Sequence, residues 1–355
     1  EEWTARSVMK ILFAPDYRQG IPYQEYLARE LRLLGQEVEF LTHYRRGLPL
    51  FRGTSPVAPD VLHIHWPENY FPNQKRFDAL RKLRYRMDLA LACRGRRLYL
   101  TAHNLLPHNR HDEWGVAANV RRTAQKADGI FVHSEFARDE MVRCFGVAAE
   151  KCWLIPYGDH TDGWDAPADT NEARRKLSLP ADQQVCLVFG TVSPYKGTDE
   201  LIEYWVQHQP AARLVVAGPV LHEDYAARLQ QLAESCDRID LRISDQWLSD
   251  EDLHLWLSAV DCSVFNYRDI FTSGAASLAR SMGVPLLIPA RLKAADLHEP
   301  HDFVYRFESL ETDFAACLEK ALQQAPSLAA AEQWRTDTSW KEVARITLEA
   351  YRATE

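Results

Sequence analysis

A short polar segment in the second half of the chain has residue types that bind phosphate groups. Thr272, Ser273 and Gly274 open a predicted helix of small residues, between apolar runs at 262–265 and 286–288 that predict strands. The first N–H groups of a helix are unpaired and lie at the positive end of its dipole, so they attract anions. Hydroxyl groups add donors, and glycine lets a ligand approach the backbone. A Ser-capped core helix explains the same residues, and both interpretations stay open.

A second phosphate-type segment lies upstream. Gly190 follows an apolar run, and Lys196 comes six residues later, just before a predicted helix. A lysine in this place would act as a mobile point charge for phosphate oxygens. The Gly-Lys-[Ser/Thr] signature of a P-loop is absent, so the segment is not that motif. Gly218 and Pro219 form the turn after the next predicted strand, and Arg268 comes shortly before the hydroxyl pair.

Polar side chains also follow three predicted strands in the first half of the chain. Ligands of open parallel sheets bind at the carboxyl ends of the strands, so we expect chemistry there. The residues concerned are Asp16, His65, Glu68, His103, Asn104 and His108. A structural His–Trp–Pro turn explains His65 and Glu68 equally well. Three polar groups together after one strand make His103, Asn104 and His108 a better site candidate than a buried core histidine.

Strands and helices alternate along the whole chain. Short apolar runs predict buried parallel strands. These runs are 8–14, 38–41, 61–65, 98–102, 130–132, 153–156, 185–189, 214–217, 239–243, 262–265, 286–288 and 303–307. Strand–helix–strand at this spacing predicts a doubly wound α/β fold. The first turn has no glycine-rich dinucleotide fingerprint, which argues against an NAD-binding domain. Residues 43–59 are basic and rich in Pro and Gly, and we predict a loop there.

Length, charge and cysteine usage indicate two domains in a cytoplasmic protein. The chain has 355 residues, long for one core. Residues 1–162 carry a net charge of +4 and the remainder −12, which supports two domains with different partners. No apolar run approaches the roughly 20 residues of a membrane helix, and the start shows no secretory signal. Seven scattered cysteines without a Cys-x-x-Cys pair predict reduced thiols and no structural zinc site.

The segment at 75–97 is strongly basic. It holds nine Lys or Arg residues, opposed only by Asp78 and Asp88. Apolar residues recur in it at helical spacing, and we expect this stripe to be core; they are Phe77, Leu80, Leu83, Met87 and Leu91. A merely solvated face explains the basic residues. The alternative is docking onto anionic lipid or a phosphate-bearing acceptor. Nothing in the segment specifically indicates nucleic-acid binding.

Taken together, the order and spacing of these motifs resemble the GT-B glycosyltransferases, most closely the nucleotide-sugar-dependent family 4 and its relatives. The resemblance covers nearly the whole chain. The matching residues are His63-Ile64-His65-Trp66, His103-Asn104, Pro107-His108, Pro156-Tyr157-Gly158, Gly190, Lys196-Gly197, Ala217-Gly218-Pro219, Thr272-Ser273-Gly274 and Gly283-Val284-Pro285. The resemblance implies two Rossmann-like domains facing a cleft. They would be an acceptor domain at 1–162, a nucleotide-sugar domain at 163–335 and a C-terminal helix at 336–355 that crosses back to the first domain.

The resemblance also implies roles for particular residues. Lys196 and the Ser273–Gly274 amides would hold the donor diphosphate, with His103 near the donor sugar and residues 16–20 near the sugar–phosphate junction. We add Thr272 and Arg268 to the diphosphate site, and assign Gly190, Gly218 and Pro219 to donor-binding loops. His65, Asn104 and His108 would lie near the sugar or acceptor. Family 4 enzymes usually carry two glutamates eight positions apart, but this chain has Ile270 and Leu278 there, and Thr191 replaces an arginine usual after Gly190.

The expected activity is transfer of a hexose-type sugar from a nucleoside-diphosphate sugar to a saccharide acceptor, lipid-linked by our interpretation, in bacterial polysaccharide or glycoconjugate synthesis. We expect no cofactor and no metal. A retaining course needs no protein base, because the leaving phosphate takes the acceptor proton. An inverting course needs a base, with His103, Asp16 and Glu68 as candidates. A non-catalytic sugar-nucleotide-binding protein and a GT-B epimerase or phosphorylase are the alternatives. The expected location is the cytoplasm, or the inner face of the cell membrane as a peripheral protein.

Overall fold

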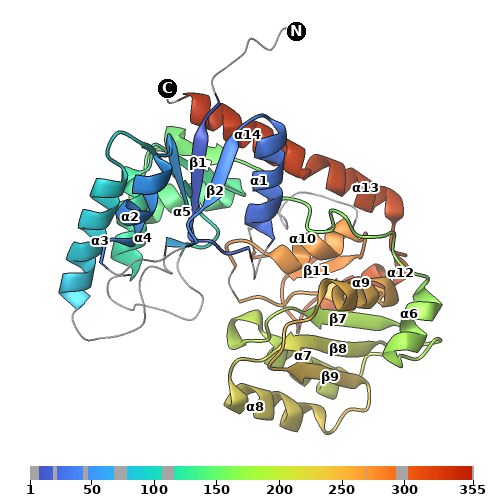
Figure 1. Cartoon of the computed structure of the whole chain (residues 1–355). Helices are drawn as coiled ribbons and strands as arrows, with labels where there is room; N and C mark the ends of the chain where they lie inside the picture. The colour runs from blue at the N-terminus through green and yellow to red at the C-terminus, as the bar shows by residue number, and fades with distance from the viewer. Residues whose placement is uncertain are drawn as a thin grey trace. The chain divides into compact units, whose positions relative to one another are not determined.

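The computed structural model describes residues 8–18, 22–42, 47–67, 78–105, 116–268, 270–292 and 303–353. The chain divides into two compact units: unit 1 is 1–158 with 338–355, and unit 2 is 159–337. Each unit contains a six-stranded sheet in which every pair of neighbouring strands is parallel (Figure 1). This architecture confirms the predicted α/β class with two doubly wound domains. No helix within the described ranges is long and apolar enough to span a bilayer.

Unit 1 has the strand order β2-β1-β3-β4-β5-β6. Its inner strands β1, β3, β4 and β5 are buried on both faces along almost their whole length, as the near-continuous apolar runs of a parallel sheet predict, whereas the edge strands β2 and β6 are partly exposed. The elements are β1 (Lys10–Ala14), α1 (Tyr23–Leu33), β2 (Glu37–Phe40), α2 (Pro49–Val57), β3 (Val61–His65), α3 (Asp78–Ala92), β4 (Arg97–Thr101), α4 (Val116–Lys126), β5 (Gly129–Val132), α5 (Glu135–Phe145), β6 (Cys152–Leu154) and α14 (Trp340–Ala353).

Unit 2 has the strand order β12-β11-β10-β7-β8-β9. The sequence interpretation did not predict its helices α6 and α13. The elements are α6 (Thr170–Leu177), β7 (Val185–Phe189), α7 (Thr198–His208), β8 (Arg213–Pro219), α8 (Glu223–Ala233), β9 (Ile239–Ser244), α9 (Asp250–Ala259), β10 (Cys262–Val264), α10 (Gly274–Ser281), β11 (Leu286–Pro289), β12 (Val304–Phe307), α12 (Phe314–Gln323) and α13 (Leu328–Asp337).

Each sheet has one point at which the strand order reverses, and these points place the candidate sites. In unit 1 the reversal lies between β1 and β3, and in unit 2 between β7 and β10. The connections after two such strands diverge to opposite faces, which leaves a crevice at the carboxyl edge of the sheet where ligands bind. Asp16 and His65 lie at this edge in unit 1, and Gly190 lies at the corresponding edge in unit 2.

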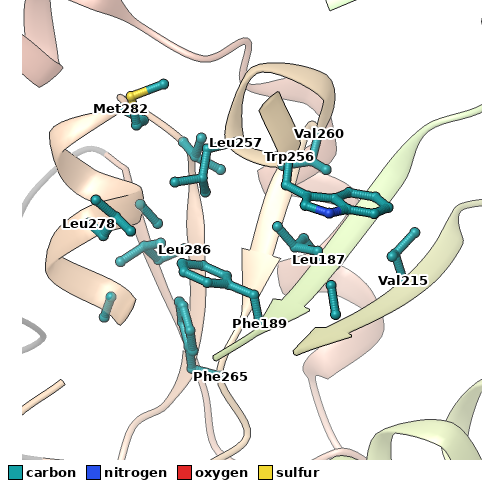
Figure 2. Packing of buried hydrophobic residues seen from close by; sticks show 14 of the residues in the cluster. Leu187, Phe189, Val215, Trp256, Leu257, Val260, Phe265, Leu278, Met282 and Leu286 are labelled. Atoms are coloured by element: carbon teal, nitrogen blue, oxygen red, sulfur yellow. The ribbon is translucent and has the colours of Figure 1, made fainter. Parts of the chain in front are cut away.

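Alternation along β7 divides the core of unit 2 between the two faces of its sheet. Leu187 and Phe189 pack on one face with Trp256 of α9 and Leu278 of α10 (Figure 2). Cys186 and Val188 point to the other face, in a cluster with α7, α8 and α12. The helix α10, whose first turn is the predicted phosphate-binding segment, is therefore fixed to the sheet by its own buried side chains.

The predicted loop at 43–59 is wrong in its second part, because residues 49–57 form α2. Pro49 occupies the first helical turn, where its fixed φ is favourable. The Asp88 carboxylate of α3 accepts hydrogen bonds from Leu50 N at 3.0 Å and Phe51 N at 2.8 Å. The groups that cap this helix thus come from a residue 38 positions away in sequence, which local sequence patterns do not reveal.

The last helix, α14, is part of unit 1 and lies beside α1 (Figure 1). Tyr351 Oη and His63 Nδ1 form a 2.6 Å hydrogen bond inside the core. Tyr99 Oη donates to Ala350 O at 2.6 Å, and the Arg97 guanidinium donates to Tyr351 O. Burial lowers the pKa of His63 to about 3, so this histidine is neutral at pH 7. Polar side chains of the sheet therefore fix the helix in register.

Gly158→Ala tests the packing of α14 on unit 1. Gly158 has a φ of 97°, and an added Cβ would overlap the Trp340 indole. Gly163 has a φ of 87° with nothing within 4 Å of an added Cβ, so Gly163→Ala is the matched control. The control is expected to lose about 1 kcal/mol from the left-handed backbone alone. Gly158→Ala should lose clearly more in urea unfolding, and equal losses would contradict the packing argument.

Candidate functional site

Lys196 lies at the reversal point of unit 2, and it is a buried cation with no counter-charge among the residues that the structure describes. Only 7% of the residue is exposed. No hydrogen bond or ion pair of its ammonium group is found among the described residues, and its nearest charge-stabilising contact is the Tyr267 ring, 5.4 Å from Nζ to the centroid. A Cβ built on Gly190 would lie 3.3 Å from Lys196 Nζ and 3.8 Å from the Ala275 Cβ. The ammonium group is therefore placed between the turn after β7 and the first turn of α10.

The first turn of α10 is built as the sequence predicts. Ser273 is the N-cap, and its Oγ accepts a hydrogen bond from Ala276 N at 3.2 Å. Tyr267 Oη lies 3.2 Å from the same Oγ, so one ring contacts both the cap and the lysine. Gly274 and Thr272 are partly exposed. The structure thus brings Lys196 together with the 272–274 segment, an arrangement of cation, hydroxyl and first-turn helix amides that suits a diphosphate.

Burial lowers the pKa of Lys196 to about 8. The cause is desolvation, which disfavours the charged form. The shift from the ordinary lysine pKa of 10.5 corresponds to about 3 kcal/mol against the charged form. A bound anion would remove this penalty, because it supplies the missing counter-charge.

The glycines at this edge allow two turns to approach each other. Gly190 has a φ of 85° and Gly218 a φ of 138°. A Cβ on Gly218 would overlap Gly190 O, so the turns after β7 and β8 are in backbone contact. Val192 N donates to Pro219 O at 2.8 Å. Gly190, Gly218 and Pro219 therefore shape the site through the backbone, while their contact with a donor stays a prediction.

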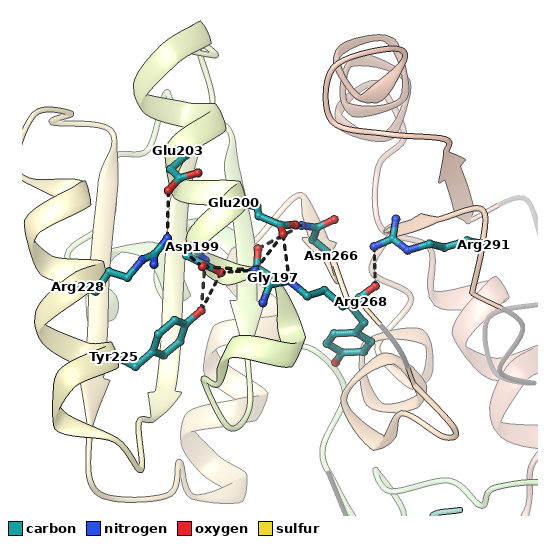
Figure 3. Close-up of polar contacts among 10 residues, drawn as sticks. Gly197, Asp199, Glu200, Glu203, Tyr225, Arg228, Asn266, Arg268 and Arg291 are labelled. Atoms are coloured by element: carbon teal, nitrogen blue, oxygen red, sulfur yellow. Dashed lines mark hydrogen bonds and ion pairs between the residues drawn. The ribbon is translucent and has the colours of Figure 1, made fainter. Parts of the chain in front are cut away.

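The Arg268 guanidinium group forms ion pairs with two carboxylates (Figure 3). Its guanidinium lies 2.9 Å from Glu200 Oε1 and 3.3 Å from Asp199 Oδ1. Asp199 also accepts from Tyr225 Oη at 3.1 Å, and Arg228 lies 3.4 Å from its Oδ2. These contacts compete with the predicted diphosphate contact of Arg268, because its charge is already compensated.

The carboxylate contacts of Arg268 belong to a network that joins the two phosphate-type segments. Asn266 Nδ2 donates to Gly197 O at 3.1 Å and to Glu200 Oε2 at 2.9 Å. Arg268 N donates to Tyr195 O at 2.8 Å. The segment before α10 is thereby held against the segment that carries Lys196. Sequence reasoning missed Asn266 and Tyr267, whose roles arise only from contacts between distant segments.

Histidines from three strands of unit 1 meet at the carboxyl edge of its sheet. His65 Nδ1 lies 3.1 Å from His103 Nε2, so one ring donates to the other. Trp66 stacks on His103 with 3.9 Å between centroids and 10° between planes. Trp66 has a φ of 46°, which bulky residues rarely adopt and which is common at functional sites. The structure thus places the predicted pair His65 and His103 in direct contact.

The environment of this pair is apolar and tightly packed. Burial lowers the pKa of His65 well below its usual value and that of His133 to about 4, so both are neutral at pH 7. His65 Nε2 and Tyr23 Oη are buried with no partner within the described residues. The Tyr23 ring contacts His103 edge-on, with 4.7 Å between centroids. Asn104 borders a small cavity of about 10 Å³ beside His103, with room for about one water.

The Asp16 carboxylate forms an ion pair with Arg18. Arg18 Nε lies 2.9 Å from Asp16 Oδ1, and Arg18 Nη2 lies 3.0 Å from Oδ2, a two-pronged contact. The hydrogen bonds from Arg18 lower the pKa of the Asp16 carboxyl group, which weakens it as a general base. Glu68 and His108 lie outside the described residues. Their predicted roles stay predictions, as do those of Asp16 and His103.

The two positions that lack the usual glutamates are part of the unit 2 core. Ile270 is 5% exposed and Leu278 is 7% exposed, and both belong to the cluster around Phe189 and Trp256. Figure 2 shows Leu278 in this cluster. The apolar side chains are therefore accommodated by packing. Within the described part of the chain no group of three or more His, Cys, Asp or Glu residues is placed to hold a metal ion.

Comparison with known proteins agrees with this architecture. Residues 23–162 match the model of Glycosyltransferase Family 4. A GDP-mannose:glycolipid 4-beta-D-mannosyltransferase of Xanthomonas campestris pv. campestris is 26% identical over 241 residues, which cover 65% of this chain and 61% of the relative. The match thus spans less than two thirds of that relative.

Solved structures with the same fold cover nearly the whole chain. Anabaena HepE in complex with UDP and glucose has a TM-score of 0.70 and 16% identity, over 97% of this chain and all of HepE. WaaG, a glycosyltransferase involved in lipopolysaccharide biosynthesis, has a TM-score of 0.63 and 15% identity, over 98% of this chain and 99% of WaaG. A glycosyltransferase from Rickettsia africae has a TM-score of 0.72 and 12% identity, over 98% and 99%. The chain therefore shares the fold of these glycosyltransferase structures, and its residues 23–162 resemble glycosyltransferase family 4.

The Lys196→Met variant is expected to be more stable than the wild type but to lose nucleotide binding. Removing an uncompensated buried cation should raise the free energy of unfolding by up to about 3 kcal/mol below pH 8. This gain should shrink between pH 8 and 10.5, where the folded wild type already has a neutral lysine and the unfolded chain does not. Urea unfolding at several pH values measures this gain in the free energy of unfolding. Lys320→Met is the control, because Lys320 is exposed.

The same variant should lose the thermal shift given by nucleoside diphosphates. Wild-type affinity should fall as the pH rises through about 8, because the free protein then loses the charge on Lys196. A Lys196→Met protein that still binds UDP or GDP like the wild type would contradict the assignment.

Arg268→Gln is expected to weaken nucleotide binding severalfold, through loss of the network, and far less than Lys196→Met. Stability should fall by about 1 kcal/mol at most, because the ion pairs are partly exposed. Arg228→Gln is the matched control, since Arg228 also contacts Asp199 but not the 266–268 segment. A loss as complete as that of Lys196→Met would instead indicate direct contact of Arg268 with the diphosphate.

Proposed function

We propose that this protein transfers a hexose-type sugar from a nucleoside-diphosphate sugar to a saccharide acceptor carried on a lipid. The observation that carries the proposal is the buried, uncompensated ammonium group of Lys196 at the first turn of α10. A diphosphate is the ligand whose charge and size suit that arrangement. Similarity to a GDP-mannose-dependent relative makes GDP-mannose the first donor to test, with UDP-glucose second because HepE binds UDP and glucose.

Catalysis in this proposal is electrostatic. As the sugar–phosphate bond breaks, charge accumulates on the leaving diphosphate, and Lys196 with the α10 amides would stabilise it more in the transition state than in the ground state. Because these groups are fixed before the reaction, little reorganisation is needed. We expect the reaction to need neither a metal nor a cofactor, which is tested by comparing rates in EDTA and in Mg²⁺.

We propose a retaining course, in which the leaving phosphate accepts the acceptor proton. The bidentate contact of Arg18 with Asp16 supports this choice, since it weakens one of the candidate bases. An inverting course is the second candidate, because the Xanthomonas relative is named a beta-mannosyltransferase and its donor GDP-mannose is the α anomer. His103, held by His65, would then be the base to test first, with Glu68 as the next candidate.

The proposed acceptor is a lipid-linked saccharide. The Xanthomonas relative acts on a glycolipid, and WaaG takes part in lipopolysaccharide biosynthesis, so a lipid-linked acceptor in bacterial polysaccharide or glycoconjugate synthesis is the class to test. A lipid-linked acceptor is presented at a bilayer surface. The protein would therefore work as a peripheral protein at the inner face of the cell membrane.

Turnover of GDP-mannose and UDP-glucose with and without a lipid-linked acceptor tests the proposal. The expected result is acceptor-dependent release of nucleoside diphosphate, lost in Lys196→Met. NMR of the product linkage gives the stereochemistry: a retained α linkage supports the retaining course. A β linkage together with loss of turnover in His103→Ala supports the inverting course. Donor binding without turnover for any acceptor would indicate a non-catalytic sugar-nucleotide-binding protein.

A further inference from the structure

The helix α3 is apolar on two opposite faces. Its inward face is formed by Tyr85, Asp88, Leu89 and Ala92, of which none is more than 2% exposed. Its outward face carries three long apolar side chains: Leu80 is 69% exposed, Leu83 55% and Met87 51%. The expectation that this apolar stripe is core is therefore wrong for Leu80, Leu83 and Met87.

The three exposed side chains form one continuous ridge. Spacings of three and four residues place Leu80, Leu83 and Met87 on one side of the helix, about half a turn from Tyr85 and Leu89. We call these three residues the α3 ridge. Figure 1 shows α3 beside α2 and α4 within unit 1, and those helices contact it on other sides.

The α3 ridge differs from the other exposed apolar residues of the molecule. Among the described residues, six other large hydrophobic side chains are exposed, and each stands alone on its own element or loop. They are Val8, Leu33, Leu154, Leu221, Trp247 and Leu328. Single exposed apolar residues are common and need no explanation, whereas a contiguous set indicates an interaction surface.

Positive charge flanks the ridge on both sides. Arg84 and Arg86 are exposed, and at 100° per residue they lie on opposite flanks of the ridge. No ion pair of either guanidinium group is found in the described part of the chain. An apolar stripe bordered by arginines is the pattern of a helix that lies in a membrane interface, with apolar side chains among the acyl chains and guanidinium groups at lipid phosphates.

We propose that the α3 ridge docks unit 1 on an anionic lipid bilayer. A protein partner is less favoured, because the ridge consists of three apolar side chains bordered by exposed arginines, whereas the centre of a protein interface is depleted in charge. The inference rests on the proposed function in one respect, since a lipid-linked acceptor explains why the protein would meet a bilayer. It names the apolar ridge as the inserted element, whereas the sequence predicted only a basic face at 75–97.

Vesicle sedimentation tests the proposal, with vesicles of phosphatidylcholine alone or mixed with phosphatidylglycerol. The wild type should bind the mixed vesicles and bind the neutral vesicles weakly. Leu83→Ser with Met87→Ser should bind the mixed vesicles about tenfold more weakly or worse. Leu33→Ser with Leu154→Ser is the matched control, because it removes two exposed leucines of unit 1 that lie outside α3.

A second pair of substitutions tests the contribution of the flanking positive charge to vesicle binding. Arg84→Gln with Arg86→Gln should weaken binding to the mixed vesicles by about 30-fold. Arg121→Gln with Arg122→Gln removes two exposed arginines of the neighbouring α4 and should change binding much less. Equal losses in both pairs would mean that net charge rather than the ridge determines binding, and would overturn the proposal.

Three further outcomes would also overturn the proposal. These are no retention of the wild type by anionic vesicles, unchanged retention of the ridge variant, and a wild-type dimer in analytical ultracentrifugation that the ridge variant abolishes. Nucleotide thermal shifts of the same variants distinguish this inference from the proposed function. They should equal those of the wild type, because the donor site lies in unit 2. If the Leu83→Ser, Met87→Ser variant has a lower melting temperature than the wild type, Met87→Ser alone is tested in its place. Its binding to vesicles is compared with the wild type in the same way.

Discussion

The site in unit 2 depends on one unfavourable interaction, the burial of the Lys196 ammonium group without an anion. Three features of its surroundings hold that group in place. They are the left-handed turns at Gly190 and Gly218, the Tyr267 ring, and the polar network of Asn266 and Glu200. In an apolar environment a charge interacts more strongly with an incoming anion than it would in water. The cost of burying this charge would therefore become affinity for the proposed anionic ligand, and the packed core of unit 2 offsets it.

The helix α10 connects this site to the core. Its first turn presents the N-cap Ser273 and partly exposed amides, while Ala276, Leu278 and Ala279 are buried against the sheet. An arrangement of this kind fixes the amides before any ligand arrives, which lowers the reorganisation needed on binding. The apolar residues at 270 and 278 strengthen the anchoring but place no charged group there. If the site binds a nucleotide sugar as proposed, recognition would rely more on the diphosphate, or on backbone groups and amides such as Asn266.

How much of this could be predicted from the sequence depends on how local each feature is. Buried strands, the Ser273 cap and the Lys196 segment have local signatures, and the structure has them where they were expected. The helix α2 was missed because Asp88 caps it from another helix, and the contacts of Arg268 were missed because its carboxylate partners lie 68 and 69 residues away. The exposure of Leu83 was also beyond prediction, since helical spacing shows that apolar residues share a face but not which face is covered.

Charge distribution suggests why the two units differ in their surfaces. Residues 1–162 have a net charge of +4 and the rest −12, yet Lys196 and the proposed anion site lie in the acidic part. Surface charges are screened within about 8–10 Å in physiological salt, whereas a buried cation is screened little, so the local lysine outweighs the overall charge of unit 2. At a large anionic surface such as a bilayer, the overall charge of a unit outweighs a single buried lysine, because many surface charges act together. A negative unit 2 is repelled by such a surface, and a basic unit 1 is attracted, so the same asymmetry that leaves the donor site undisturbed favours docking through unit 1.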